Sequence, residues 1–331
     1  MSFAYPPRKQ LARLPTPVEP LDRLSALLDG PRIWIKRDDL TECVASGNKI
    51  RKLEFLLAEA ERRGCDTLIT CGGVQSNHAR ATALMGARHG FRVHLVLRGE
   101  QPECADGNLM LDKIAGASIE FHANHYYQQH QHDLLREAAE RERAKGHNPL
   151  VIPTGASDGT GIWGYIACAE ELKQDFLDHG IEPAAIVSAT GSGGTQAGLT
   201  AGCQIHNIET QVWGFAVCDD ADYFRKKVKN DLALCQEQYE LPVDPESLIV
   251  NVNDQYIGPG YGKAGEEIFA TIKQVATLEG IVLDPVYTGK AFHGMMSEIG
   301  NGKLASRGED IVFIHTGGVF GLFPQKQNFV R

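Results

Sequence analysis

Residues 46–54 hold a lysine whose surroundings suit Schiff-base chemistry. Lys49 comes two residues after Gly47, at the predicted start of a helix. The positive end of the helix dipole and partial burial both disfavour an ammonium ion, so both lower the pKa of this amine. A lysine amine with a lowered pKa attacks carbonyl carbons more readily. Lys52 follows one helical turn later, and an ordinary basic helix start is the alternative interpretation of the segment.

A second candidate site is the turn at residues 72–78, Gly-Gly-Val-Gln-Ser-Asn-His, after an apolar run that ends at Cys71. Ser76 or Asn77 can cap the helix that follows. The free backbone N–H groups of a first helical turn attract anions, so a substrate carboxylate fits here. A simple helix N-cap is the alternative.

The turn at residues 190–198 has the composition and context of a phosphate cradle, because it follows a strand and opens a helix. It lacks the dinucleotide fingerprint, since the sixth position is Gln196 rather than glycine, and this argues against an NAD-dependent dehydrogenase. No Gly-Lys-Ser/Thr follows, so the triphosphate pattern is absent too. We therefore expect a site for one phosphate group, formed by Thr190, Gly191, Ser192, Gly193, Gly194 and Thr195.

Two tyrosines and a threonine complete the candidate chemistry. Tyr261 and Tyr287 each stand in a loop before a predicted helix, and Thr316 follows the last predicted strand. Tyrosines in such loops can stack on a ring or exchange a proton. Taken alone, each of these residues is more often a packing residue.

These residues require an α/β framework to bring them together. Short apolar runs predict strands at 33–37, 67–71, 93–97, 118–121, 150–153, 185–189, 212–217, 248–252 and 311–315. Helical patterns lie between them, and this alternation predicts two open, twisted parallel sheets with helices on both faces. Ligands of such folds bind at the carboxyl ends of the strands, where the glycine-rich turns occur.

Composition excludes several classes of protein. The 331 residues carry a net charge of −9, which argues against sequence-independent binding to nucleic acid. No apolar run is long enough to span a membrane, and the first residues do not resemble a secretory signal. The eight cysteines form no Cys-x-x-Cys pair, so we expect reduced cysteines in a cytoplasmic protein and no metal site.

The segment 121–143 is unusually rich in histidine and glutamine. His130 and His132 are two residues apart and do not share a helix face. This spacing favours a solvated helix over a metal site, which is the alternative.

A Schiff-base lysine, a site for one phosphate, a carboxylate loop and two tyrosines suggest pyridoxal 5'-phosphate as cofactor. The chain resembles the family of 1-aminocyclopropane-1-carboxylate (ACC) deaminase and D-cysteine desulfhydrase, which has the tryptophan-synthase-β-like fold, fold type II. The resemblance covers about residues 14–323. Its markers are Trp-Ile-Lys-Arg-Asp-Asp at 34–39, Gly-Asn-Lys-Ile-Arg-Lys-Leu-Glu-Phe at 47–55, Gln-Ser-Asn-His at 75–78, Gly-Ser-Gly-Gly-Thr at 191–195, Gly-Tyr-Gly at 260–262, Leu-Asp-Pro-Val-Tyr-Thr-Gly-Lys at 283–290 and Phe-Ile-His-Thr-Gly-Gly at 313–318.

The resemblance implies a role for each matching residue. Lys49 would carry the cofactor and move the substrate Cα proton. Asn77 would bond the phenolic oxygen of the cofactor, and Ser76 with backbone groups of Asn77 and His78 would hold the substrate carboxylate. Ser76 is also a candidate base or nucleophile. Residues 191–195 with Lys52 would bind the phosphate, while Tyr261 and Tyr287 would flank the ring and the departing group.

Two positions distinguish activities within the family. The resembling ACC deaminases carry Glu where this chain has Thr288 and Leu where it has Thr316. A carboxylate beside the pyridine nitrogen keeps that nitrogen protonated and strengthens the electron sink, which the opening of a cyclopropane ring requires. Thr288 and Thr316 match the desulfhydrase pattern. Ser46 departs from the glycine that relatives commonly have directly before Gly47.

The resemblance therefore implies an α,β-elimination that converts D-cysteine to pyruvate, hydrogen sulfide and ammonia. L-Cysteate sulfo-lyase, ACC deaminase and a non-catalytic pyridoxal-phosphate carrier are the alternatives. We expect a large cofactor domain of residues 1–49 and 161–331 and a small domain of residues 50–160. A homodimer is expected from the resemblance alone.

Overall fold

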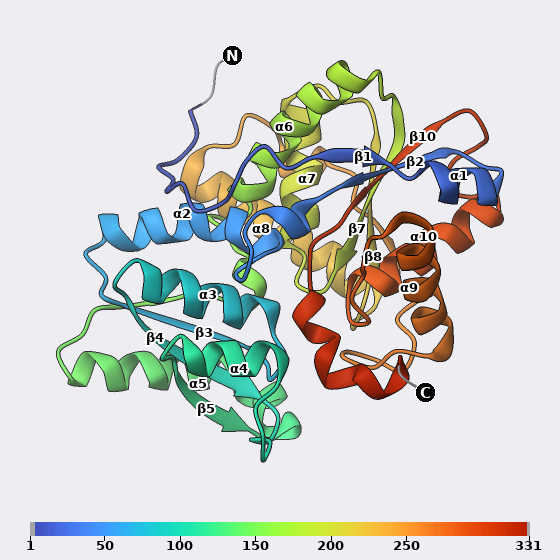
Figure 1. Cartoon of the computed structure of the whole chain (residues 1–331). Helices are drawn as coiled ribbons and strands as arrows, with labels where there is room; N and C mark the ends of the chain where they lie inside the picture. The colour runs from blue at the N-terminus through green and yellow to red at the C-terminus, as the bar shows by residue number, and fades with distance from the viewer. Residues whose placement is uncertain (1–3, 330–331) are drawn as a thin grey trace.

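The computed structural model describes residues 4–329, which form two sheets (Figure 1). The larger sheet has the strand order β1-β2-β10-β7-β8-β9, and only β1 runs antiparallel to its neighbour. The smaller sheet has the order β5-β4-β3-β6 and is entirely parallel. The strands are β1 (Val18–Pro20), β2 (Arg32–Lys36), β3 (Thr67–Gly73), β4 (Arg92–Arg98), β5 (Ser118–His122), β6 (Pro149–Val151), β7 (Pro183–Thr190), β8 (Gln211–Ala216), β9 (Asn251–Asn253) and β10 (Asp310–Ile314).

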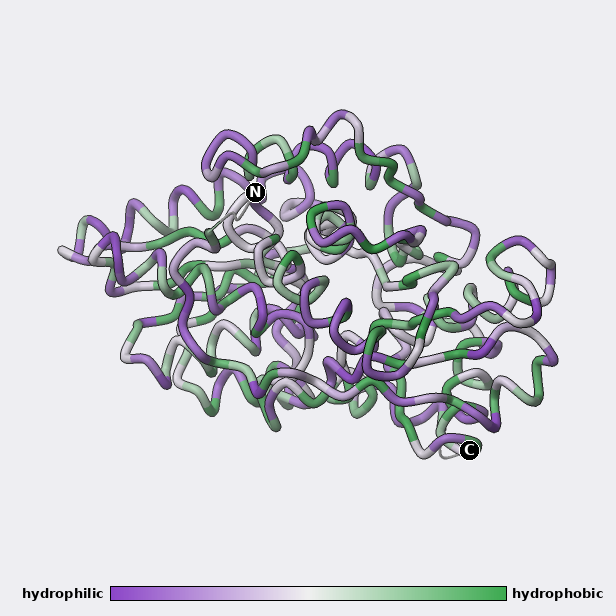
Figure 2. The backbone as a smooth tube through the Cα atoms, turned by 90° about the horizontal axis from the view of Figure 1, so that it is seen from above, coloured by the Kyte–Doolittle hydropathy of each residue, from purple (hydrophilic) through white to green (hydrophobic). Residues whose placement is uncertain are grey.

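Helices cover both faces of each sheet, which confirms the predicted fold class. They are α1 (Asp22–Leu28), α2 (Asn48–Arg62), α3 (Asn77–Arg88), α4 (Gly107–Ile114), α5 (Asn124–Ala144), α6 (Trp163–His179), α7 (Gly194–Ile205), α8 (Ala221–Tyr239), α9 (Glu266–Glu279) and α10 (Thr288–Gly300). In Figure 2, green and purple stretches alternate along the tube at the periphery, as amphipathic helices require. No helix within residues 4–329 is long and apolar enough to cross a membrane.

The strands of the larger sheet are apolar on both faces because both faces are covered. Successive residues of a strand point to opposite faces. In β10, Ile311 and Phe313 pack in the core beneath α9 and α10, whereas Val312 and Ile314 pack in the core beneath α6 and α7. This continuous apolar run is typical of a buried parallel strand.

The smaller sheet is covered in the same way. In β3, Leu68 packs in a core that includes residues of α2 and α3, while Ile69 and Cys71 pack against Leu134 and Ala138 of α5. The elements of this sheet gather at the lower left of Figure 1. Its strands all lie within residues 50–160, and the strands of the larger sheet lie on either side of that range. The domain boundaries at 49/50 and 160/161 stay a prediction.

Two strands differ from expectation. The strand predicted at 248–252 is shorter and lies at Asn251–Asn253, because Leu248 ends a 3-10 turn at Pro245–Ser247. The structure adds β1, which the sequence pattern does not reveal because it has only three residues and ends in Pro20. The other predicted strands each overlap an observed one.

Candidate active site

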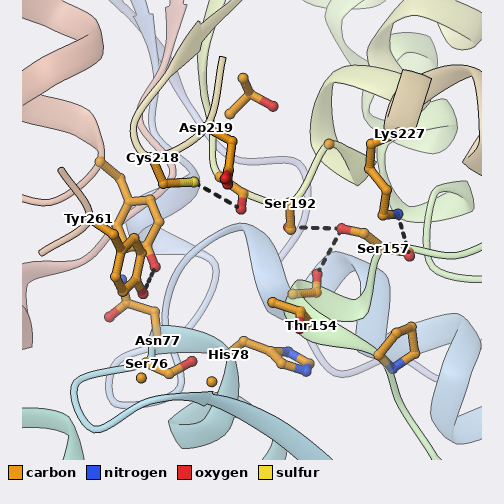
Figure 3. Close-up of a pocket in the computed structure, with 18 of the residues that line it drawn as sticks. Ser76, Asn77, His78, Thr154, Ser157, Ser192, Cys218, Asp219, Lys227 and Tyr261 are labelled. Atoms are coloured by element: carbon orange, nitrogen blue, oxygen red, sulfur yellow. Dashed lines mark hydrogen bonds between the residues drawn. The ribbon is translucent and has the colours of Figure 1, made fainter. Parts of the chain in front are cut away.

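A cavity of about 410 Å³ opens at the carboxyl ends of β3, β7 and β10, where the glycine-rich turns were expected to form a site. Most of the predicted site residues line it: Lys49, Ser76, Asn77, His78, Thr190, Gly191, Ser192, Gly193, Thr195, Tyr261, Tyr287 and Thr316. Lys52, Gly194 and Thr288 are not among the residues that line it. In Figure 3, Tyr261 stands opposite Ser157 and Lys227, with the labels of Ser76, Asn77 and His78 below.

Lys49 is held on a turn that is fixed against the end of β10. The backbone of Gly47 has φ 105°, and a Cβ there would lie 2.5 Å from the carbonyl oxygen of Thr316. The N–H group of Asn48 donates to the same oxygen at 3.2 Å. Only glycine permits this conformation and this close approach. The turn therefore brings the lysine at the start of α2 to the edge of the larger sheet.

The amine of Lys49 is the group that can form a Schiff base. Its Nζ donates to Asn48 Oδ1 at 3.0 Å. Burial and the charge of Arg80 lower the pKa of Lys49 to about 8, and the charge of Asp284 opposes this shift. The direction is the one expected from the sequence, but burial and a neighbouring cation are its causes in the structure. A larger fraction of the amine is thus neutral near pH 7 than in free lysine.

The loop before α3 presents polar groups from the smaller sheet. Ser76 caps α3, because its Oγ accepts from the N–H group of Ala79 at 3.2 Å. His78 Nε2 lies 2.7 Å from Thr70 Oγ1, whose hydroxyl proton is donated to the carbonyl oxygen of Ile152. The Nε2 atom of His78 therefore carries the proton. Burial lowers the pKa of His78 well below its usual value, so the ring is neutral.

The glycine-rich turn at the end of β7 forms the opposite end of the cavity. Gly193 has φ 85° and precedes α7. Ser157 Oγ donates to Ser192 Oγ at 2.9 Å (Figure 3). It also accepts from the N–H group of Gly194 at 3.1 Å. A Cβ on Gly194 would lie 2.6 Å from Ser157 Oγ and 2.9 Å from Lys52 Nζ. Gly194 thus lets the chain pass closely over the lysine.

At this end of the cavity a buried lysine, Lys52, makes no ion pair with a carboxylate of residues 4–329, although the charges of Asp231 and Asp158 act on it. Lys52 is buried, and burial together with the charge of Lys49 lowers the pKa of its amine well below the usual value. Within residues 4–329 its Nζ bonds only neutral oxygens, at 3.1 Å from Gly155 O and 3.3 Å from Ser157 Oγ. Thr190 Oγ1 is also buried without a hydrogen-bond partner in the described chain. A phosphate group supplies the missing charge and acceptors, so the residues present fit the expected cofactor.

The two tyrosines form a pair that the sequence does not predict. Their hydroxyl oxygens are 2.5 Å apart, and their ring centroids are 5.9 Å apart in an edge-to-face arrangement. Burial raises the pKa of both phenols, so both are protonated near neutral pH. One hydroxyl donates to the other, which leaves one proton free to be donated into the cavity.

Thr288 and Thr316, which the sequence treats as equivalent neighbours of the cofactor, occupy different environments. Thr316 lines the cavity. Thr288 Oγ1 donates to Asp284 Oδ1 at 2.7 Å and accepts from the N–H group of Asp284 at 2.8 Å. The hydroxyl of Thr288 is therefore engaged in the buried turn before α10. Only Thr316 is free to offer its hydroxyl to a ligand.

Several lining residues were missed. Arg98 ends β4, so the rule that parallel strands place ligands at their carboxyl ends could have identified it. Its guanidinium lies 4.8 Å from the centroid of the Tyr261 ring. The helix expected to be merely solvated, α5, also contributes to the wall, through Tyr127, Gln128, Gln131 and His132. Cys218, Asp219, Tyr223 and Lys227 line the cavity as well, without any sequence motif to signal them. Within residues 4–329 no group of three potential ligands is arranged to hold a metal ion.

Comparison with known proteins supports this assembly. The model of the family described as pyridoxal-phosphate dependent enzyme matches residues 9–317. A Thermotoga maritima protein provisionally named ACC deaminase is 44% identical over 98% of this chain and 100% of its own length. A D-cysteine desulfhydrase of Klebsiella pneumoniae is 40% identical over 96% of this chain and 95% of its own.

The fold agrees with these similarities in sequence. The crystal structure of an ACC deaminase homologue superimposes with a TM-score of 0.88 at 38% identity, and covers 97% of this chain and 95% of that one. The two sheets and their helices are those of fold type II. The family match at residues 9–317 includes every strand of both sheets and every residue that lines the cavity. The chain therefore belongs to the pyridoxal-phosphate-dependent enzymes, in the family of ACC deaminase and D-cysteine desulfhydrase.

Proposed function

We propose that this enzyme catalyses α,β-elimination on a small amino acid, with D-cysteine as its substrate. The observation that carries the proposal is one cavity lined by Lys49, by the hydrogen-bonded Tyr261–Tyr287 pair and by the neutral Thr316. Bound pyridoxal phosphate supplies a carbonyl group that links to amines and a ring that withdraws electrons from Cα. The protein must then remove the Cα proton and protonate the departing sulfur.

The residues of the cavity divide these tasks. Lys49 takes the Cα proton, because its lowered pKa leaves the amine partly neutral near pH 7. The Ser76 hydroxyl and the backbone N–H groups that follow it hold the substrate carboxylate at the start of α3. The tyrosine pair donates its free proton to the sulfur as the bond from Cβ to sulfur breaks. The reaction consumes one water molecule and releases pyruvate, hydrogen sulfide and ammonia.

The residues at 288 and 316 support elimination over opening of the ACC ring, because neither Thr288, where the resembling ACC deaminases carry Glu, nor Thr316 supplies a carboxylate. A neutral hydroxyl holds a proton on a pyridine nitrogen less firmly than a carboxylate does. Removal of an α-proton with a good leaving group on Cβ requires a weaker electron sink than cleavage of a carbon–carbon bond in a substrate without an α-hydrogen. The chain is similar to proteins named for either activity. The choice between D-cysteine elimination and ACC ring opening therefore rests on the chemistry of the site.

Arg98 favours a second candidate, elimination of sulfite from L-cysteate. A sulfonate on Cβ requires a cationic partner in the cavity. Arg98 lines the cavity beside Tyr261, and within residues 4–329 it makes no ion pair with a carboxylate. Its guanidinium is therefore available to an anionic substituent of the substrate.

A product assay separates these functions. The purified enzyme is incubated with D-cysteine, L-cysteine, L-cysteate or ACC, and sulfide, sulfite and 2-oxo acids are measured. Sulfide and pyruvate from D-cysteine alone support the proposal. Sulfite from L-cysteate supports the second candidate, and 2-oxobutanoate from ACC contradicts the argument from Thr288 and Thr316. No turnover of any of the four substrates would favour a non-catalytic carrier.

A further inference from the structure

Arg80 of α3 is a buried cation that joins three segments around the cavity. Its side chain is fully buried. Nη1 donates to Asn77 Oδ1 at 3.1 Å and to Asn108 Oδ1 at 2.7 Å, and Nη2 donates to the carbonyl oxygen of Ser46 at 2.6 Å. The guanidinium also lies 4.9 Å from the centroid of the Phe320 ring, in the segment after Thr316. One side chain thus links the Asn77 loop, the Lys49 turn and the C-terminal segment.

These contacts determine which way the amide of Asn77 points. A guanidinium only donates hydrogen bonds, so the atom of Asn77 that faces it must be the oxygen. Asn108 Nδ2 donates to the same oxygen at 3.1 Å. The Nδ2 group of Asn77 is therefore turned away from both donors, and it bonds no other residue in 4–329. Since Asn77 lines the cavity, this group is left to donate to a ligand there.

The charge of Arg80 is only weakly compensated. Asp112 is the acidic residue that most influences it, but both carboxylate oxygens of Asp112 are buried without a hydrogen-bond partner in the described chain. Burial raises the pKa of Asp112 to about 8, so this group is largely protonated near neutral pH. Two other charged groups interact with Lys49. The charge of Asp284 raises the pKa of Lys49, and the charge of Lys49 lowers the pKa of Lys52. His78, whose pKa is also lowered, is neutral.

We propose that Arg80 is a positioning residue, which fixes the Asn77 amide with Nδ2 toward the cofactor and ties the Lys49 turn to the same loop. The inference rests on the proposed placement of Asn77 beside the cofactor, and it does not depend on the identity of the substrate. A lysine in this place keeps the charge but cannot reach three acceptors with one planar fork. A glutamine removes the charge as well.

The test uses the purified full chain from which pyridoxal phosphate has been removed. The measured quantities are the Kd for added pyridoxal phosphate, the absorbance maximum of the rebuilt complex and the pH midpoint of rebinding. We expect Arg80→Lys and Arg80→Gln each to raise the Kd about tenfold, the effect of losing one charge-assisted hydrogen bond. The pH midpoint should move upward in Arg80→Gln alone, because only that variant removes the charge that lowers the Lys49 pKa. Arg88→Gln, an exposed position on the same helix, is the matched control and should change neither quantity.

A double-mutant cycle tests whether Arg80 acts through Asn77. In the Asn77→Ala background, Arg80→Lys should raise the Kd by a smaller factor than it does alone, because the amide it orients is absent and only the bonds to the Ser46 carbonyl and to Asn108 are lost. If the double variant raises the Kd by the product of the two single effects, Arg80 does not act through Asn77. A wild-type Kd and an unshifted midpoint in folded Arg80→Gln would overturn the proposal altogether.

A gentler variant covers the case in which the Arg80 variants do not fold. Asn108→Ala removes the other donor to Asn77 Oδ1 and leaves the guanidinium in place. We expect its Kd to rise about threefold, and to equal that of Asn77→Ala when the two are combined. A wild-type Kd in Asn108→Ala would contradict the orientation argument. Failure to turn over D-cysteine would reject the proposed substrate but would not change these Kd ratios.

Discussion

The two ends of the cavity are built in different ways. The phosphate end is centred on consecutive residues, 190–195, whose backbone forms a turn between β7 and α7, with Lys52 and Ser157 packed against it. The opposite end combines Ser76 from the loop before α3, Tyr261 and Tyr287 from the loops before α9 and α10, and Arg98 from the end of β4. The centre of one end is local in the sequence, whereas the other end exists only after both sheets have formed.

The two ends also handle charge differently. At the phosphate end, buried Lys52 makes no ion pair with a carboxylate within residues 4–329, so an anionic ligand would supply the missing partner. At the other end, the Asp284 carboxylate accepts hydrogen bonds from Val286, Tyr287 and Thr288 and does not line the cavity. We infer from this difference that the phosphate end supplies affinity for the cofactor, whereas the other end selects the chemistry. The following experiments test this division.

Removal of the Lys49 amine, which serves both ends of the cavity, should have the largest effect. We expect Lys49→Ala to lose the absorbance band of the linked cofactor and to reduce turnover about 1,000-fold. Lys145→Ala, on the exposed end of α5, is the control. Elimination of sulfide at the wild-type rate by Lys49→Ala would show that another group removes the Cα proton.

Lys52→Met tests whether the phosphate end supplies affinity. We expect the Kd for pyridoxal phosphate to rise about 100-fold, because a charge-assisted bond to phosphate is lost. The cofactor-free protein should unfold at an unchanged or higher temperature, since the variant replaces a buried amine that makes no ion pair with a carboxylate within residues 4–329. Calorimetry of both forms measures this, with exposed Lys226→Met as control. A lower unfolding temperature without cofactor would mean that Lys52 has a structural role.

Arg98→Gln tests the selectivity of the other end. If the guanidinium binds an anionic substituent, kcat/KM for L-cysteate should fall about 30-fold, while the Kd for pyridoxal phosphate stays the same. D-Cysteine turnover should change less, because its thiol is smaller and largely neutral near pH 7. Equal losses for both substrates would assign Arg98 to the support of Tyr261 instead.

The lowered pKa of Lys49 predicts how cofactor binding depends on pH. With a pKa of about 8, the neutral fraction of the amine, and with it the rate of cofactor linkage, should rise about tenfold between pH 7 and pH 9 and then level off. A lysine with its ordinary pKa would still be gaining neutral amine above pH 10. Stopped-flow absorbance at constant ionic strength distinguishes the two profiles.

The smallest effect concerns the two threonines. We expect Thr316→Val to reduce turnover about fivefold and to leave stability unchanged, because its hydroxyl faces the cavity. Thr288→Val should instead lower the free energy of unfolding by about 2 kcal/mol, since Asp284 loses both a donor and an acceptor. A loss of turnover without a loss of stability in Thr288→Val would instead place Thr288 at the cofactor.

The sequence alone determined the parts of the site that are continuous in the chain. The Lys49 turn, the Ser76–His78 loop and the glycine-rich turn each consist of a few neighbouring residues, and their residue types dictate turns, helix caps and anion sites. The strand and helix pattern likewise predicted two parallel sheets, because strands buried on both faces are short continuous apolar runs and the helices between them have an apolar period of about 3.6 residues.

Only the tertiary structure decided which distant residues meet. It separated Thr288 from Thr316, paired the hydroxyls of Tyr261 and Tyr287, and brought Arg98 and α5 to the cavity wall. It also showed that Arg80 acts on the pKa of Lys49 from another helix. Such contacts depend on how two sheets pack, and no local pattern of residues encodes them, because side chains far apart in the sequence influence one another only through space.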